Sequence, residues 1–275
     1  MKNIKNILCP TDFSPAAQNA IAYAAKLAQI VQGDLTLLHV QSVFDFTPAS
    51  LVSGKKILLT NAVEQLETQC TEVSRAFKIS CYPEVESSAS KLSTVIHEKA
   101  KNFDIIVMGT DGADDWYQFF GGSNTYNAIA RSETPLLLIP SGYIFSEIKT
   151  MVYAFDYLKE RHLPITHLLP IVKALNCKLT ILQVIEEAYS QDVEDDLKEL
   201  QYIIGNFYGE DLHFDYSTIR SNDVAQAINS YIVRNQPDSL VLCSVHRNII
   251  QRLFHNSLIK KITAFCNYPL FVIHS

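Results

Sequence analysis

The loop at residues 108–125 has the spacing of glycine and hydroxyl residues best suited to holding a phosphate. It reads Met-Gly-Thr-Asp-Gly-Ala-Asp-Asp-Trp-Tyr-Gln-Phe-Phe-Gly-Gly-Ser-Asn-Thr. Glycine allows the backbone to approach a ligand closely. Gly122 and Ser123 open a predicted helix, whose free N–H groups and positive dipole end favour an anion. Taken alone, the loop fits a plain tight turn equally well.

A second polar segment follows the first apolar run, with the sequence Pro10-Thr11-Asp12-Phe13-Ser14-Pro15. Ser14 is a favourable helix N-cap and Pro15 a favourable first helical residue. Asp12 lies at the end of the predicted strand, where two roles are open. Its carboxylate either faces a ligand or caps the helix that follows.

Periodicity predicts the elements that position these segments. Apolar runs predict strands at 7–10, 35–40, 79–85, 105–108 and 136–139. Helical spacing predicts helices from Pro15 onward and over 57–77, 90–101 and 123–131. The predicted buried faces of the first two helices are Ala17, Ala20, Ile21, Ala24, Leu27 and Ala28, and then Val63, Leu66, Cys70 and Val73. This alternation predicts a doubly wound α/β domain with a five-stranded parallel sheet and helices on both faces. Ligands of such sheets bind beyond the strands' carboxyl ends, where the strand order reverses.

The chain repeats this pattern. Residues 7–12 align with 151–156 and 34–40 with 178–184, at an offset of 144 residues. Residues 104–109 align with 238–243 and 134–139 with 268–273, at an offset of 134. The second copy is therefore ten residues shorter between Val40 and the strand near Tyr82. We expect one domain at 1–144 and its copy at 145–275.

The glycine spacing G-2x-G-9x-G-[S/T] resembles the nucleotide motif of the universal stress protein family, which Gly109, Gly112, Gly122 and Ser123 match at every position. The segment 10–14 also resembles the first-strand segment of ATP-binding members. The likeness extends over both copies, so the chain resembles a tandem universal stress protein with an adenine nucleotide alpha hydrolase-like fold. The resemblance implies a stress-response or regulatory module that binds ATP or ADP in its N-terminal repeat.

The resemblance also implies the site. Asp12 would lie beside the adenosine, Val40 would present its backbone to the adenine, and residues 109–125 would surround the ribose and phosphates. The implied nucleotide-binding residues are Pro10, Thr11, Asp12, Val40, Met108, Gly109, Asp111, Gly112, Gly122, Ser123, Asn124 and Thr125. Asp114 and Asp115 would repel a triphosphate unless a divalent cation such as Mg²⁺ intervened, or they point to solvent.

The second copy has lost this motif. At the offset of 134, Cys243, His246 and Asn256 replace the three glycines, and Ser257 replaces Ser123. We therefore expect no ATP in the second half, where the basic loop 247–261 faces solvent, another anion or an acidic partner. The alternative function is a ligand-free interaction scaffold in which both pockets are vestigial. Nothing resembles a positioned general base with a nucleophile, so any ATP hydrolysis would be slow, and we expect no metal site.

Strand edges predict the assembly. The apolar segments 136–139 and 270–273 end each copy, and exposed apolar edges require a partner. In the resembled family, single-domain members dimerise through this edge, so the two copies are expected to pair antiparallel as an intramolecular pseudo-dimer. Whether whole chains dimerise further is left open.

Composition excludes several other classes of protein. The 275 residues are 48% hydrophobic and carry a net charge of −6, which disfavours nucleic-acid binding. No apolar run approaches the length of a membrane span. The six cysteines form no C-x-x-C pair and lie mostly in apolar runs, as expected of reduced thiols in a cytoplasm. No Walker loop and no G-x-S-x-G motif is present.

Overall fold

The computed structural model describes residues 4–42, 54–90, 92–110, 134–155, 165–185, 198, 202, 214–244 and 268–274. The predicted helix at 123–131 lies outside these residues, as does most of the glycine loop. No helix within the described ranges is long and apolar enough to cross a membrane.

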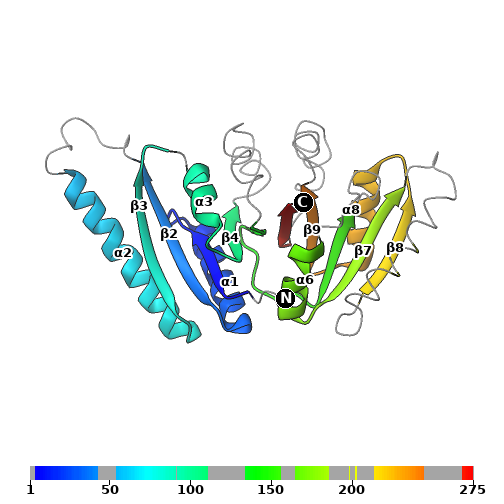
Figure 1. Cartoon of the computed structure of the whole chain (residues 1–275), viewed down its shortest axis with the longest axis horizontal. Coiled ribbons are helices and arrows are strands. Elements are labelled where there is room, and N and C mark those ends of the chain that lie inside the picture. Colours follow the sequence, from blue (N-terminus) through cyan, green and yellow to red (C-terminus); the bar gives the residue numbers. More distant parts are fainter. Residues whose placement is uncertain are drawn as a thin grey trace.

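The first half alternates strands and helices as its periodicity predicts (Figure 1). Its elements are β1 (Asn6–Pro10), α1 (Pro15–Val31), β2 (Asp34–Ser42), α2 (Gly54–Phe77), β3 (Cys81–Ser88), α3 (Leu92–Ala100), β4 (Ile105–Thr110) and β5 (Leu136–Pro140). Ser14 is the N-cap of α1, because its hydroxyl accepts a hydrogen bond from the Ala17 backbone, and Pro15 is the first helical residue.

The second half repeats the alternation. Its described elements are β6 (Thr150–Phe155), α6 (Ile165–Leu175), β7 (Lys178–Ile185), β8 (Phe214–Arg220), α8 (Val224–Asn235), β9 (Ser239–Ser244) and β10 (Leu270–His274). Asp223 caps α8 by accepting a hydrogen bond from the Gln226 backbone at 3.0 Å. The alternation again makes parallel pairs, because each strand returns through a crossover.

All ten described strands form one sheet, in the order β3-β2-β1-β4-β5-β10-β9-β6-β7-β8. Each half thus has the same strand order, read outward from the β5–β10 seam at the centre of Figure 1. Leu138 pairs with Leu270 and Leu137 with Phe271 in the only antiparallel pair among these strands. This confirms the antiparallel contact predicted for the two final strands.

The strand registers locate the length difference between the halves. Ile7 pairs with Leu35 and with Ile105, and the equivalent Met151 pairs with Leu179 and with Ser239. These pairings keep the offsets of 144 and 134 residues. The third strands already have an offset of 133, because Cys81 pairs with Leu35 and Phe214 pairs with Leu179. The shortening therefore falls between the second and third strands of the second half, as the alignment predicts.

Two apolar clusters cover the two faces of the sheet. One contains the buried residues of α1, α2 and α6, and the other contains those of α3 and α8. The predicted face of α1 is buried throughout. The predicted face of α2 is wrong at one position, because Val63 is 36% exposed and Ala62 is buried instead. Ala62 lies one helical turn before Leu66, whereas Val63 points outward.

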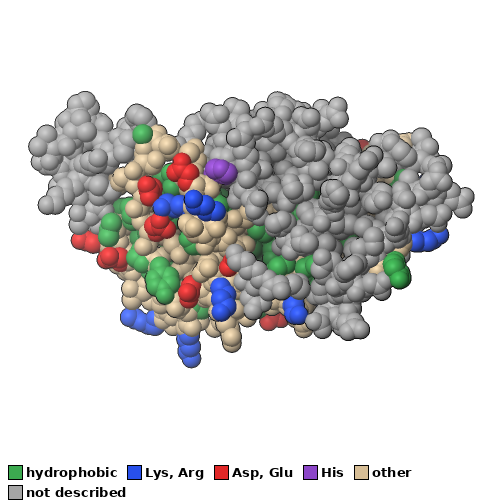
Figure 2. Space-filling model, in the orientation of Figure 1, with side chains coloured by type: hydrophobic (Ala, Val, Ile, Leu, Met, Phe, Trp, Pro, Cys, Tyr) green, Lys and Arg blue, Asp and Glu red, His purple; other side chains and the backbone are tan. Residues whose placement is uncertain are grey.

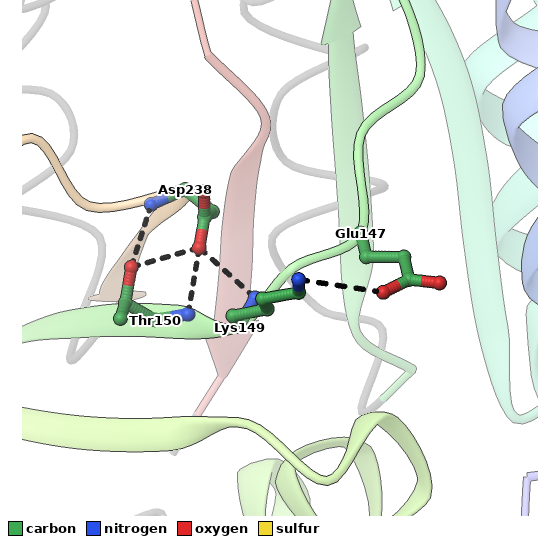
Figure 3. Close-up of polar contacts among 4 residues, drawn as sticks. All are labelled: Glu147, Lys149, Thr150 and Asp238. Carbon is green, nitrogen blue, oxygen red and sulfur yellow. Dashed lines mark hydrogen bonds and ion pairs between the residues drawn. The ribbon is translucent and has the colours of Figure 1, made fainter.

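An aspartate joins the first and fourth strands of each half at their amino ends. In the first half, Asp104 accepts hydrogen bonds from the backbone of Lys5 and Asn6, each at 2.9 Å. In the second half, Asp238 accepts from the backbone of Lys149 at 2.9 Å and from both the backbone and the hydroxyl of Thr150 at 2.8 Å (Figure 3). Asp104 and Asp238 are equivalent at the offset of 134, so both halves join these two strands through the same aspartate hydrogen bonds.

The outer strand β3 carries charged side chains along the edge of the sheet. Glu84 and Glu86 both pair with Lys99 of α3, the second at 3.1 Å. Figure 2 shows acidic and basic side chains side by side on the visible face of the first half. The charged side chains of β3, together with Pro83, disfavour the pairing of another chain with this edge of the sheet.

Candidate functional site

The described residues of the predicted site meet at one end of three neighbouring strands. Pro10, Thr11 and Asp12 end or follow β1, Val40 lies near the end of β2, and Met108 and Gly109 lie near the end of β4. Strand β1 lies between β2 and β4, and the strand order reverses there. This is the position at which doubly wound sheets place their ligands.

Asp111, Gly112, Gly122, Ser123, Asn124 and Thr125 all lie outside the described residues, as do Asp114 and Asp115. The same is true of Asp156, His246, Asn256 and Ser257 in the second half.

The backbone of Val40 faces the space beyond the end of β1. Leu38 accepts a hydrogen bond from the Thr11 backbone at 2.8 Å, so Leu38 points its polar groups toward β1. Leu35 donates instead to Ser80, on the β3 side. Because the backbone groups of successive strand residues alternate between the two sides, Val40 points the same way as Leu38. The last residue of β1, Pro10, pairs with Leu38, so Val40 extends past it.

Two aromatic residues, Phe13 and His39, pack against each other at this strand end, and neither is among the predicted site residues. His39 donates from Nδ1 to the carbonyl oxygen of Thr11 at 2.9 Å, since a carbonyl can only accept. The Phe13 ring lies against the His39 ring, with centroids 4.7 Å apart. Phe13 has a φ of +65°, a left-handed conformation that a bulky residue rarely adopts. The sequence shows only that a histidine precedes Val40, because the contact with Phe13 depends on the pairing of β1 with β2.

Asp12 does not cap α1. Its Oδ1 accepts a hydrogen bond from the backbone of Ser14 at 2.9 Å, and Ser14 is the cap. Partial burial raises the pKa of Asp12. This effect of burial is outweighed by hydrogen bonds from the Ser14 side chain and backbone and by the charge of His39. The pKa of Asp12 therefore lies below its ordinary value. The exposed Asp12 side chain is therefore ionised at neutral pH and can accept hydrogen bonds from a ligand's hydroxyl groups.

Gly109 is a glycine because α1 approaches it closely. A Cβ at this position would lie 2.2 Å from the carbonyl oxygen of Ala16, in the first turn of α1. The packing of helix against strand therefore accounts for this glycine without a phosphate. The equivalent residue, Cys243, is a buried side chain with 5% exposure. The second half consequently has a side chain where the first half has helix backbone.

A groove of about 550 Å³ is also lined by Phe13. Phe13 and Gln18 line it together with one face of α2, made of Asn61, Glu64, Gln65, Thr68, Gln69 and Glu72. This lining contains two carboxylates and no lysine or arginine, so it would repel a phosphate. This groove is therefore poorly suited to a phosphate.

Comparisons with known proteins give the family. The model of the Universal stress protein family matches residues 3–140. The universal stress protein MJ0577 of Methanocaldococcus jannaschii is 26% identical over 152 residues, which are 49% of this chain and 94% of that protein.

Two solved structures extend the likeness to the whole chain. A universal stress protein from Archaeoglobus fulgidus has a TM-score of 0.73 at 15% identity, covering 99% of this chain and 97% of that one. A functionally unknown protein from Pseudomonas aeruginosa has a TM-score of 0.56 at 14% identity, covering 98% and 92%. At these identities the structures support the fold. The family model covers half of the chain, and the chain belongs to the universal stress protein family.

Proposed function

We propose that the first half binds ATP or ADP beyond the carboxyl ends of β1, β2 and β4, as a nucleotide-binding stress-response module. The orientation of the Val40 backbone carries this proposal. An N–H and a C=O of one residue, both directed past the end of β1, match the donor and acceptor edge of adenine. The polar side chains of Thr11 and Asp12 lie next to them.

The rest of the nucleotide is assigned to the flanking segments. Asp12 accepts hydrogen bonds from the ribose hydroxyls, because its carboxylate is ionised at neutral pH. Gly112, Gly122, Ser123, Asn124 and Thr125 hold the phosphates through backbone N–H groups and hydroxyls. Mg²⁺ screens the phosphates from Asp114 and Asp115.

The two halves are proposed to be copies of one domain, at 1–144 and 145–275, that form a pseudo-dimer within the chain. Their equal strand order and the antiparallel β5–β10 seam support this arrangement. A cytoplasmic location is part of the proposal, because Cys9, Cys70, Cys81, Cys177 and Cys243 are free thiols.

The test is nucleotide binding by the full chain. Protein purified without added ligand is denatured, and released nucleotide is measured by absorbance and chromatography. Titration of the emptied protein with Mg-ATP should then give a saturable heat. Gly122→Val should abolish that heat, because a β-branched side chain fills the space in which phosphate meets backbone. Asn256→Val, at the equivalent position of the second half, is the matched control and should bind like the original chain.

The proposal fails if no nucleotide is released and Mg-ATP gives no heat. That result would favour the interaction scaffold. If the Gly122→Val variant and the Asn256→Val variant both bind Mg-ATP normally, the nucleotide binds elsewhere than at the glycine loop.

A further inference from the structure

Three cysteines of the first half lie on the sheet face that α1 and α2 cover. Cys9 of β1 pairs with Leu37 and Cys81 of β3 pairs with Leu35, two positions apart on β2. Paired residues of a parallel sheet point to the same face, as do strand residues two apart. Cys70 of α2 belongs to the apolar cluster on this face, and Cys81 packs against that cluster.

Cys81 packs against the same apolar cluster that contains Cys70, where α2 covers the sheet beside β3. The interaction of the two thiols lowers the pKa of the Cys70 thiol and raises that of Cys81. Cys70 is 3% exposed, whereas Cys81 is partly exposed at the first residue of the outer strand β3. Both are free thiols. The pair therefore combines an activated thiol with a partner that solvent reaches.

The other described thiols, of Cys9, Cys177 and Cys243, are all buried. Cys9 is completely buried, and burial raises its pKa strongly. Cys177 is 4% exposed, donates to the carbonyl oxygen of Val172, and has a pKa raised to about 12 by burial. Because the thiolate is the reactive form, these two are expected to be inert.

We propose that Cys70 and Cys81 are a redox-sensitive thiol pair that hydrogen peroxide converts into a disulfide between α2 and β3. The Cys70 thiolate attacks one peroxide oxygen, the O–O bond breaks, and the departing hydroxide takes a proton and leaves as water. Cys70 is then a sulfenic acid. The Cys81 sulfur attacks the Cys70 sulfur, so that the S–S bond forms, the S–O bond breaks, and a second water leaves with the Cys81 proton. Two thiols lose two electrons, and one peroxide becomes two waters.

The disulfide would fasten the last turns of α2 to the outer strand. Only the short segment between residues 70 and 81 lies inside the closed loop, and it already turns from helix to strand. The oxidised protein should therefore keep its fold and resist local opening of α2.

Peptide mapping of the full chain tests the pair. Native protein is exposed to peroxide, remaining thiols are alkylated, and the chain is digested with trypsin. Arg75 and Lys78 lie between the two cysteines, so the disulfide should join peptides 57–75 and 79–91. The joined species should disappear after treatment with dithiothreitol. Cys177→Ala is the matched control and should retain it, whereas Cys81→Ser should lose it and leave a Cys70 sulfenic acid that dimedone traps.

The proposal is overturned if Cys70 and Cys81 remain fully alkylatable after peroxide, or if Cys9 is joined to either of them instead. Circular dichroism checks that Cys81→Ser folds. If Cys81→Ser does not fold, Cys70→Ala is used in its place. The peptide map of the original chain by itself shows whether the disulfide between Cys70 and Cys81 forms. None of these readouts involves nucleotide, so the outcome is independent of the function proposed above.

Discussion

At the scale of single residues, a short series of hydrogen bonds fixes the backbone conformation at the carboxyl end of β1. Asp12 accepts a hydrogen bond from the Ser14 backbone, and Ser14 caps α1. Thr11 is hydrogen-bonded to Leu38 and to His39 on β2. Each of these groups fixes the backbone on which a ligand would rest. Changes here are therefore expected to affect both the stability and the site.

Asp12→Asn should make stability less dependent on pH. Because the fold lowers the pKa of Asp12 below its ordinary value of 3.8, the stabilisation is complete above pH 3.8 and is lost as pH falls through the lower folded-state pKa. The variant, which has no ionised carboxylate, should be less stable at neutral pH and equal to the original chain in strong acid. Urea unfolding at both pH values measures this. An equal deficit at both would mean that the carboxylate charge has no part in it.

Gly109→Ala should destabilise the fold by about 1–3 kcal/mol, the usual cost of overpacking. The added Cβ would lie 2.2 Å from the Ala16 carbonyl oxygen, which is helix backbone and cannot rotate away. Thermal unfolding without nucleotide measures the loss. If the variant kept full stability but lost Mg-ATP binding, the glycine would serve the ligand rather than the helix.

The sequence predicted some of these residues and not others, for physical reasons. Asp12, Val40 and Gly109 stand at the ends of apolar runs, so local pattern was sufficient to place them. The contact of Phe13 with His39 depends on the pairing of β1 with β2 and on a positive φ at Phe13, neither of which is visible in local pattern. The reason for Gly109 also needed the position of α1.

At the scale of elements, periodicity predicted every described strand of the first half, but not the strand ends. Strand β3 was predicted at 79–85 and spans Cys81–Ser88, because its length follows the register with β2 up to Ser42. One position of the predicted α2 face was also wrong. Ala62 is buried and Val63 is exposed, because Ala62 lies one helical turn before the buried Leu66.

The aspartate at the amino end of β9 should be a strong element-level determinant of stability. Asp238→Ala removes the charged acceptor of three hydrogen bonds and should cost about 1.5–3 kcal/mol. Glu147→Gln is the matched control in the same view of Figure 3. Its ion pair with Lys149 spans 3.9 Å between highly exposed side chains and should change the stability little. Chemical denaturation of both variants gives the comparison, and equal losses would contradict it.

At the scale of the whole molecule, the β5–β10 seam and the connection beside it hold the halves together. Leu137 and Phe271 pair across the seam and are almost completely buried. Tyr143 and Phe145, in the connection between β5 and β6, pack on Tyr23 of α1, with the Phe145 ring centroid 4.8 Å away. The seam could be predicted because apolar edge strands require a partner. The aromatic contact could not, since it depends on where the connection crosses α1.

The two halves should differ in ligand binding although they share a strand order. Cys243 places a buried side chain at the position equivalent to Gly109, where the first half has no side chain. His246 and Asn256 replace the other two motif glycines. Titration of the full chain with Mg-ATP should therefore saturate at one nucleotide per chain. Cys243→Gly alone should leave this stoichiometry unchanged, because two substituted glycines remain. A measured value of two equivalent sites would show that side chains at these positions are compatible with the nucleotide, and the asymmetry argued here would be wrong.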